Sequence, residues 1–293
     1  MAIAELDHTK CVVPQTLDGP LLNLGCGGRF HPAWVNVDVR PQSPSVIGHD
    51  LLSGPLPLAA DHFAVVYHSH VLEHVPRERV RWFLGECRRV LRPGGILRVA
   101  VPDLEQISRL YLEALERAEH APDWQTRYDW AVLEMYDQTV RENMGGSMLD
   151  YLRQAAVDPQ DFAWHRLGAD GPIIRAHLQH AAVQPPSRLG AGLRTWFSPA
   201  AWRERLLRWF LGKEYLLLQI GRFRRSGEIH HWMFDRYSLR RLLLECGFCQ
   251  VEAVHAAASR IPCWPSYGLD TQAGGRPTKP DSLYMEALKP WAR

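Results

Sequence analysis

The stretch that decides the fold is "FAVVYHSHVLEHVPRERVRWFLGECRRVLRPGGILRVAVPD", residues 63–103. Its first eight residues are apolar, β-branched and aromatic, which suits a strand buried on both faces of a sheet. Apolar side chains at helical spacing follow from Pro76 and stop at the turn 93–95, the usual asymmetry of helix ends. Residues 96–103 then predict a second strand. This strand–helix–strand order predicts a parallel sheet with helices on both faces.

The alternation continues on both sides of this stretch. Upstream, "PLLNLG" (residues 20–25) and "WVNVDV" (residues 34–39) predict two strands. Downstream, residues 235–248 predict a helix that ends at a glycine, and two strands are expected within 249–257 and 282–290. We therefore expect the C-terminal segment to complete the sheet that begins at the N-terminus.

The middle of the chain has a different texture and predicts a mostly helical insertion. Helices are expected in residues 104–119, 143–156 and 198–225, whereas 168–177 and 180–192 are rich in loop-forming residues. The predicted organisation is one domain formed by residues 1–105 and 227–293, interrupted by an insertion or lid of residues 106–226.

Composition indicates an ordinary globular protein. The 293 residues are 46% hydrophobic and 23% charged, and the net charge of +2 creates no field that would favour nucleic acid as a partner. The N-terminus lacks the pattern of a secretory signal, and no apolar stretch approaches the roughly 20 residues that span a bilayer. We expect a cytoplasmic protein with reduced cysteines.

Several polar or flexible residues follow the predicted strands directly. The glycine cluster Asn23–Arg29 follows the first strand, Asp38 ends the second, and Asp50 and Ser69 follow later strands. Open parallel sheets bind ligands at the carboxyl ends of their strands, so these residues predict a binding crevice. Each has a plainer alternative, such as a tight turn or a solvated carboxylate. The cluster is neither a P-loop nor a complete G-x-G-x-x-G motif.

The sequence resembles the class I S-adenosylmethionine-dependent methyltransferases. The segments that show the likeness most clearly are "LLNLGCGGR", "VNVDV", "HDLLSGPLPLAADHFAVVYHSHVLEHV" and "RRVLRPGGILRVAVPD". A weaker likeness is found in "GEIHHWMFDRYSLRRLLLECGF" and "KPDSLYMEALKP". The likeness is to methyltransferases of type 11, a group associated with polysaccharide and sugar biosynthesis. It implies a Rossmann-like, doubly wound, mostly parallel seven-stranded sheet that binds S-adenosylmethionine and releases S-adenosylhomocysteine.

The resemblance also implies which residues bind the cofactor. Gly25, Cys26 and Gly27 would line the methionine moiety and ribose, and Asp38 would bind the ribose hydroxyls. Asp50 with Leu51 would flank adenine, and Ser69 with His70 would face the sulfonium. The full set of expected cofactor-binding residues is Asn23, Gly25, Cys26, Gly27, Asp38, Val39, Asp50, Leu51 and Ser69.

Two residues depart from the family pattern. Asn23 stands where the first strand usually carries an acidic residue, and Arg29 replaces the third glycine of the loop. The first change weakens the electrostatic attraction for a cationic cofactor, and the second alters the loop.

The segment "HVLEH" (residues 70–74) matches the H-x-x-E-H pattern of inverted zinc peptidases. His70 and His74 would share a helix face at this spacing, but no downstream carboxylate ligand stands out. We therefore expect no metal and interpret Glu73 and His74 as polar groups at a helix start. His70 remains the candidate catalytic residue, because histidine suits a general base for a hydroxyl acceptor.

The segment "GEIHHWMFDRYS" (residues 227–238) is the candidate acceptor-binding loop. It offers four side chains of suitable chemistry, namely His230, His231, Asp235 and Tyr237. The alternative is a structural loop in which Asp235 or Ser238 caps the next helix.

The insertion contains a basic, aromatic helix around Trp209. It could lie on a membrane surface, grip an anionic substrate, or bury its apolar side chains while its arginines face solvent. The apolar side chains in question are Leu206, Leu207, Phe210 and Leu211.

These patterns predict a methyltransferase that O-methylates a glycan, glycolipid or hydroxylated small metabolite, with the insertion forming the acceptor pocket. One alternative is N-methylation of a peptide or amine. An alternative of another class is a catalytically degenerate, cofactor-binding regulatory or structural protein, which Asn23 and Arg29 would favour. The sequence identifies neither the acceptor nor the oligomeric state.

Overall fold

The computed structural model describes residues 18–155, 158, 160–183 and 198–291. The chain forms two compact units. The first, which we call the sheet unit, contains residues 1–112 and 230–293. The second, the insertion unit, contains residues 113–229.

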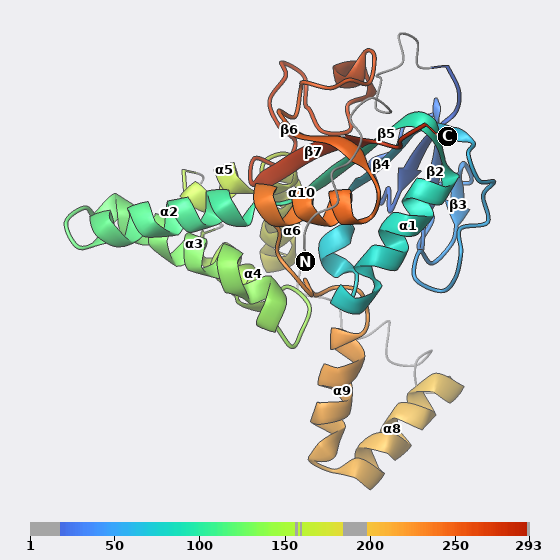
Figure 1. The fold of residues 1–293 in the computed structure, drawn as a ribbon. Coiled ribbons are helices and arrows are strands. Elements are labelled where there is room, and N and C mark those ends of the chain that lie inside the picture. The colour runs from blue at the N-terminus through green and yellow to red at the C-terminus, as the bar shows by residue number, and fades with distance from the viewer. Residues whose placement is uncertain (1–17, 156–157, 159, 184–197, 292–293) are drawn as a thin grey trace. The chain divides into compact units, whose positions relative to one another are not determined.

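The sheet unit is built on seven strands in the order β3-β2-β1-β4-β5-β7-β6 (Figure 1). Strands β1 to β5 run parallel, and β7 is antiparallel to both of its neighbours, β5 and β6. The expected mostly parallel, seven-stranded Rossmann-like sheet is confirmed. The bounds are β1 Leu21–Leu24, β2 Trp34–Asp38, β3 Val46–Gly48, β4 Phe63–Ser69, β5 Leu91–Pro102, β6 Cys249–Val254 and β7 Ser282–Leu288.

One face of the sheet is covered by helices α1 (Val80–Val90) and α10 (Arg236–Glu245). The helix α1 ends at Val90, and β5 starts at Leu91, before the turn 93–95 that was expected to end the helix. Proline restricts the residue before it to an extended backbone, so the chain leaves the helix ahead of Pro93. The buried residues of α1 are those that the helical spacing predicted: Val80, Phe83, Leu84, Cys87 and Val90.

The opposite face packs against residues 255–281, which include the short 3₁₀ helix η4 (Trp264–Tyr267). Helices were expected on this face as well, but the described connections between β1 and β4 contain none. Two of these connections are shorter than the dozen or so residues that a helical crossover needs. Trp264 fills part of the resulting space, with edge-on ring contacts to Trp34 and Tyr67.

Arg98 of β5 ties this covering segment to the sheet. Its Nε donates to Asp270 Oδ2 at 2.7 Å, and its Nη1 donates to Glu286 Oε1 of β7 at 2.7 Å. The guanidinium is fully buried, lies over the Trp264 ring, and donates further to backbone carbonyls of residues 255–258. Burial raises the pKa of Asp270, although Arg98 opposes the effect.

The insertion unit is helical, as the sequence predicts, and packs around its own core. Trp130, Leu152 and Trp164 belong to that core, and Glu134 pairs with Arg166 beside it. Helix α2 begins in the sheet unit and ends in the insertion unit. The helices are α2 Leu104–Ala118, α3 Pro122–Val140, α4 Gly146–Ala155, α5 Phe162–Arg166, α6 Asp170–Val183, α8 Pro199–Leu211 and α9 Glu214–Arg224.

The expectation of a loop in residues 168–177 is wrong, because residues from Asp170 onward belong to α6. The glycines and the proline that suggested a loop lie at or before the helix start. Pro172 falls in the first turn of α6, where proline removes no hydrogen bond of the helix. Of the second expected loop, residues 180–192, the first four also belong to α6, and the rest lies outside the described residues.

The interpretation that α8 buries its apolar side chains is wrong as well. Helix α8 contains no buried residue, and Phe210 is 74% exposed. The membrane and anionic-substrate interpretations of this helix stay predictions.

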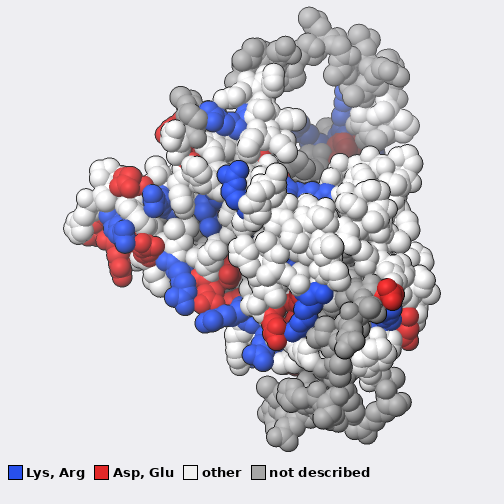
Figure 2. Space-filling model, turned by 90° about the horizontal axis from the view of Figure 1, so that it is seen from above, with Lys and Arg blue, Asp and Glu red and all other residues white. Residues whose placement is uncertain are grey.

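Three further observations bear on the expected character of the chain. No helix within the described residues is long and apolar enough to cross a membrane. Acidic and basic side chains are interspersed over the face drawn in Figure 2. Cys26, Cys87, Cys246 and Cys263 are free, whereas Cys249 is disulfide-bonded, so the expectation of reduced cysteines is wrong for Cys249.

His68 of β4 makes the stability of the sheet unit sensitive to acid. Its side chain is fully buried, and neither ring nitrogen has a hydrogen-bond partner among the described residues. Burial lowers the pKa of His68 to about 4, against a smaller opposing effect of Glu73. Between that value and the ordinary 6.5, the unfolded chain binds a proton that the folded chain does not. Stability is therefore complete at higher pH and falls as pH drops through this window.

In the wild type, the free energy of unfolding should fall by roughly 3 kcal/mol across this window because of His68. We expect the substitution His68→Phe to abolish this fall. The measurement is the free energy of urea unfolding at about pH 7 and about pH 4.5. His62→Phe, at an exposed position, is the control and should keep the wild-type dependence. Equal dependence in all three proteins would contradict the role of His68.

Candidate functional site

The glycine loop after β1 and the end of β2 are joined through Asp38. Its Oδ2 accepts from the Gly27 amide at 2.8 Å, and its Oδ1 accepts from the Arg40 amide at 2.8 Å. Gly27 has a φ of 51°, and no atom of the described residues lies within 4 Å of the position that a Cβ would take. The backbone at Gly27 is thus open to a ligand, next to a carboxylate that retains acceptor capacity.

Asn23 and Asn36 hold the loop that connects β1 with β2. Both side chains are buried, and Asn23 Nδ2 donates to Asn36 Oδ1 and to the Arg29 carbonyl, each at 3.1 Å. Asn36 Nδ2 donates to the His31 carbonyl at 3.0 Å. The two side-chain amides thus donate to backbone carbonyls of the connection between β1 and β2, which contains no helix. Asn23 therefore has a structural role, for which a carboxylate could not donate the hydrogen bonds.

The remaining expected cofactor residues lie at the ends of β1 to β4. Cys26 is buried, and burial, with a smaller effect of Asp38, raises the pKa of its thiol to about 11, so it stays protonated. The amide of His49 donates to the Asp38 carbonyl at 3.0 Å, which brings the segment before Asp50 beside β2. Asp50, Leu51 and Val39 are exposed or partly exposed, and Ser69 is partly buried.

The segment after β4 lies directly against the glycine loop. A Cβ added at Gly25 would come within 2.4 Å of Val71 Cγ2, so this close approach requires glycine. His70, between Ser69 and Val71, has a φ of 53°, which is unusual for a residue with a side chain. Strained residues of this kind cluster at functional sites.

His70 is oriented by two polar groups. Its Nε2 lies 2.8 Å from Ser282 Oγ at the start of β7, and its Nδ1 lies 3.1 Å from Glu73 Oε1. Glu73 is fully buried. Burial raises the pKa of the Glu73 carboxyl, but His70, His230 and His74 outweigh burial and hold the pKa at about 2. A carboxylate beside one nitrogen leaves the other nitrogen as the proton acceptor, the arrangement of a general base.

The helical interpretation of the H-x-x-E-H segment is wrong. Glu73 and His74 belong to a short 3₁₀ helix, η2 (Leu72–His74), and His70 precedes it with a left-handed backbone. His70 and His74 therefore do not share the face of an α-helix.

The candidate acceptor residues differ in exposure and in the contacts that they make. His230 is buried, and its ring makes an edge contact with that of His74, whereas His231 is exposed. Asp235 Oδ1 accepts from the amides of residues 237 and 238 and caps α10, as the structural alternative proposed. Tyr237 is 69% exposed. Acceptor contact by these residues stays a prediction.

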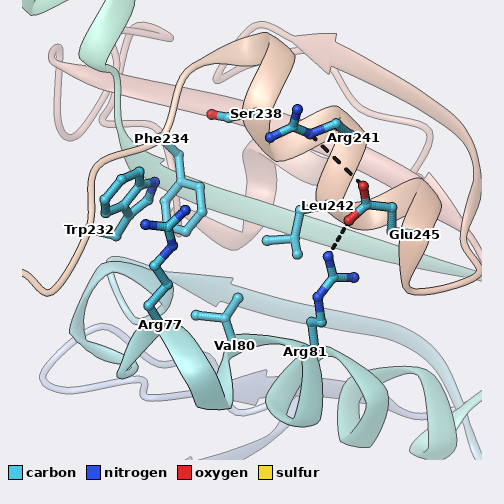
Figure 3. A pocket seen from close by; sticks show the side chains of 9 residues that line it. All are labelled: Arg77, Val80, Arg81, Trp232, Phe234, Ser238, Arg241, Leu242 and Glu245. Atoms are coloured by element: carbon cyan, nitrogen blue, oxygen red, sulfur yellow. Dashed lines mark hydrogen bonds and ion pairs between the residues drawn. The ribbon is translucent and has the colours of Figure 1, made fainter. Parts of the chain in front are cut away.

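A cavity of about 170 Å³ opens between the start of α1 and α10 (Figure 3). Its walls carry three arginines, Arg77, Arg81 and Arg241, of which the last two reach Glu245. Arg77 lies 3.9 Å over the Trp232 ring. Sequence reasoning missed this cavity, because its two walls are far apart in the chain.

Comparison with known proteins gives a family match for part of the sheet unit. Residues 33–99 match the family model of a methyltransferase domain. Among solved structures, an S-adenosylmethionine-dependent methyltransferase from Archaeoglobus fulgidus is 9% identical, with 92% of this chain and 86% of that chain covered and a TM-score of 0.36. The CurJ carbon methyltransferase is 11% identical, with coverage of 95% and 50% and a TM-score of 0.37. Likeness at this level says nothing about the acceptor. No curated protein matches the sequence.

The order and directions of the seven strands define a Rossmann-like methyltransferase fold. With the methyltransferase-domain match over residues 33–99, they support the resemblance to the class I S-adenosylmethionine-dependent methyltransferases and the expectation of a methyltransferase enzyme. The resemblance found in the sequence is confirmed at this level, and its association with polysaccharide biosynthesis stays a prediction.

Proposed function

We propose that the protein transfers a methyl group from S-adenosylmethionine to a hydroxyl group of a glycan, glycolipid or small metabolite. The observation that carries the proposal is the contact of His70 with Glu73 and Ser282 beside the glycine loop. A histidine backed by a carboxylate suits the removal of a proton from a hydroxyl, whose oxygen is a weak nucleophile while protonated.

The residues around the glycine loop fit the cofactor. Open space over Gly27 leaves room against the backbone, and Asp38 offers acceptor capacity to ribose hydroxyls. When bound, S-adenosylmethionine supplies an electrophilic methyl group on a sulfonium. The chain's own contribution is alignment of the acceptor, from which much of the acceleration of such displacements comes. The further groups that would surround the cofactor are Cys26, Asp50, Leu51 and Ser69.

His70 is the proposed catalytic residue. Glu73 would keep the imidazole oriented, and Nε2, now in contact with Ser282 Oγ, would accept the proton of the acceptor hydroxyl. Residues 106–226 are the proposed acceptor-binding region. Asn23 does not support the alternative of a catalytically degenerate protein, because hydrogen bonds of its side-chain amide within the loop explain why it is there.

Two measurements test this function. Calorimetric titration with S-adenosylmethionine should give one binding site, and absence of binding would overturn the proposal. Transfer of labelled methyl groups to panels of hydroxylated glycans, glycolipids and metabolites should then give methyl ethers, identified by mass analysis. Products formed only on amines would favour N-methylation. Binding without transfer to any acceptor would favour the degenerate alternative.

The substitution Asp38→Ala should weaken binding of S-adenosylmethionine by about 1–3 kcal/mol, the scale of hydrogen bonds lost from a charged group. Calorimetry measures the affinity, and thermal unfolding checks that the loop remains folded. Asp150→Ala, which removes an exposed carboxylate of the insertion unit, is the control and should bind like the wild type. Unchanged affinity in Asp38→Ala would refute the ribose role.

A further inference from the structure

Three side chains that come together only in the folded sheet unit form a cluster of metal-ligand type. Glu73 and His74 belong to η2, and His230 belongs to the segment before α10. Each offers one ligand atom, and these atoms lie within 4.8 Å of one another. The amide of His231 donates to the Glu73 carbonyl at 2.7 Å, which joins the two segments beside the cluster.

The Glu73 carboxylate is the second, independent observation. The side chain is fully buried, and neither oxygen has a hydrogen-bond partner within the described part of the chain. His70 Nδ1 approaches Oε1 at 3.1 Å without the geometry of a hydrogen bond. Buried carboxylates are normally paired, hydrogen-bonded or bound to a metal ion, because desolvation of an uncompensated charge is costly. Oε1 has the His70 imidazole beside it, whereas Oε2 has no such neighbour within the described residues, and an ion at this cluster would supply its missing partner.

We propose that Glu73, His74 and His230 bind one divalent transition-metal ion of the zinc class. Two imidazoles and one carboxylate are the protein ligands of many zinc sites that keep a fourth position for water or substrate. Imidazole nitrogen favours such ions over magnesium or calcium, which prefer oxygen ligands. Ligand atoms around one tetrahedral zinc ion lie roughly 3.3–3.5 Å apart, so a small closure of the cluster suffices.

The segments that carry the cluster also contribute residues to a cavity. Arg77 and Trp232, which follow His74 and His230 closely in the chain, line the cavity drawn in Figure 3. The site differs from the zinc-peptidase pattern, because His230 takes the place of the first histidine and Glu73 itself is the carboxylate ligand, in place of a carboxylate further along the chain. The sequence led us to expect no metal, since it gave no sign that His230 approaches Glu73.

The test is metal binding by the full-length chain without a histidine tag. After treatment with a chelator, the protein is dialysed against Zn²⁺ or Co²⁺, and bound metal is measured by mass spectrometry of the elements. We expect about one ion per chain, a tetrahedral absorption spectrum for Co²⁺, and a higher unfolding temperature with metal. Failure of the wild type to bind a stoichiometric ion would overturn the proposal.

Variants show whether the ion occupies this cluster. Glu73→Gln and His230→Gln should each lower the affinity for the metal ion at least about 100-fold. Mutating residues that only hydrogen-bond to metal ligands already costs up to about this much, and a ligand itself should cost no less. His231→Gln makes the same change at the exposed neighbouring residue and should bind like the wild type. If Glu73→Gln does not fold, His74→Gln at a partly exposed position takes its place. Unchanged affinity in the cluster variants, or equal loss in His231→Gln, would overturn the assignment.

This inference shares Glu73 with the proposed methyl transfer, in which Glu73 orients His70, but its test does not depend on that transfer. Metal content is measured without S-adenosylmethionine or an acceptor, so metal binding can fail while cofactor binding holds, and the reverse.

Discussion

Replacing Arg98 with alanine should lower the free energy of unfolding by about 3–5 kcal/mol. The substitution leaves Asp270 and Glu286 buried without their cationic partner, since Arg98 donates to both at 2.7 Å. It also removes the donors that satisfy carbonyls in residues 255–258 and the cation over the Trp264 ring. The segment that covers the second face of the sheet would lose its main polar attachment.

Urea unfolding followed by circular dichroism measures this loss. Arg109→Ala is the matched control, because Arg109 forms an exposed pair with Glu105 one helical turn away, and such pairs contribute about 0.3–0.5 kcal/mol. If Arg98→Ala does not fold, Asp270→Asn weakens the same network while keeping its shape. A loss in Arg98→Ala no larger than in Arg109→Ala would show that the buried network does not hold the segment.

The substitution His70→Ala should lower kcat by about 10²- to 10⁴-fold, the usual contribution of a general base. Affinity for S-adenosylmethionine should change little, because Asp38 and the glycine loop provide the proposed cofactor contacts. The assay follows labelled methyl transfer to the acceptor found in the panels above, and calorimetry gives the cofactor affinity.

Ser282→Ala is the control for this prediction, since it removes the contact at Nε2 and leaves the imidazole and Glu73 in place. It should retain most of the activity. Equal losses of turnover and cofactor affinity in His70→Ala would argue against a base and favour a structural role. An undiminished kcat would exclude His70 from the reaction.

The local patterns of the sequence predicted the sheet well for a physical reason. Residues 63–103 carry two continuous apolar strands around an amphipathic helix, and only a parallel sheet with a right-handed crossover buries all three. The strand ends followed from the same reasoning, because parallel strands place their carboxyl ends at one edge. Errors arose at boundaries, such as the end of α1 before Pro93, where a single proline decides the last turn.

The covering of the second face was not predictable in this way. Residues 255–281 are largely irregular, so they show no periodicity from which packing could be inferred. Their attachment depends on Arg98 and Asp270, which are 172 residues apart. The exposure of α8 was missed for a related reason: an amphipathic pattern indicates a face that could be buried, not whether a partner surface exists.

By itself, the sequence determined the strand–helix–strand unit of residues 63–103, the strands on either side of it and the methyltransferase resemblance, because each depends on residues close together in the chain. Only the tertiary structure decided which polar groups surround His70. Ser282, 212 residues away, meets its Nε2, and His230 meets Glu73 beside it. These contacts form only when β7 and the segment before α10 pack beside the end of β4. The local pattern of side chains carries no information about that packing.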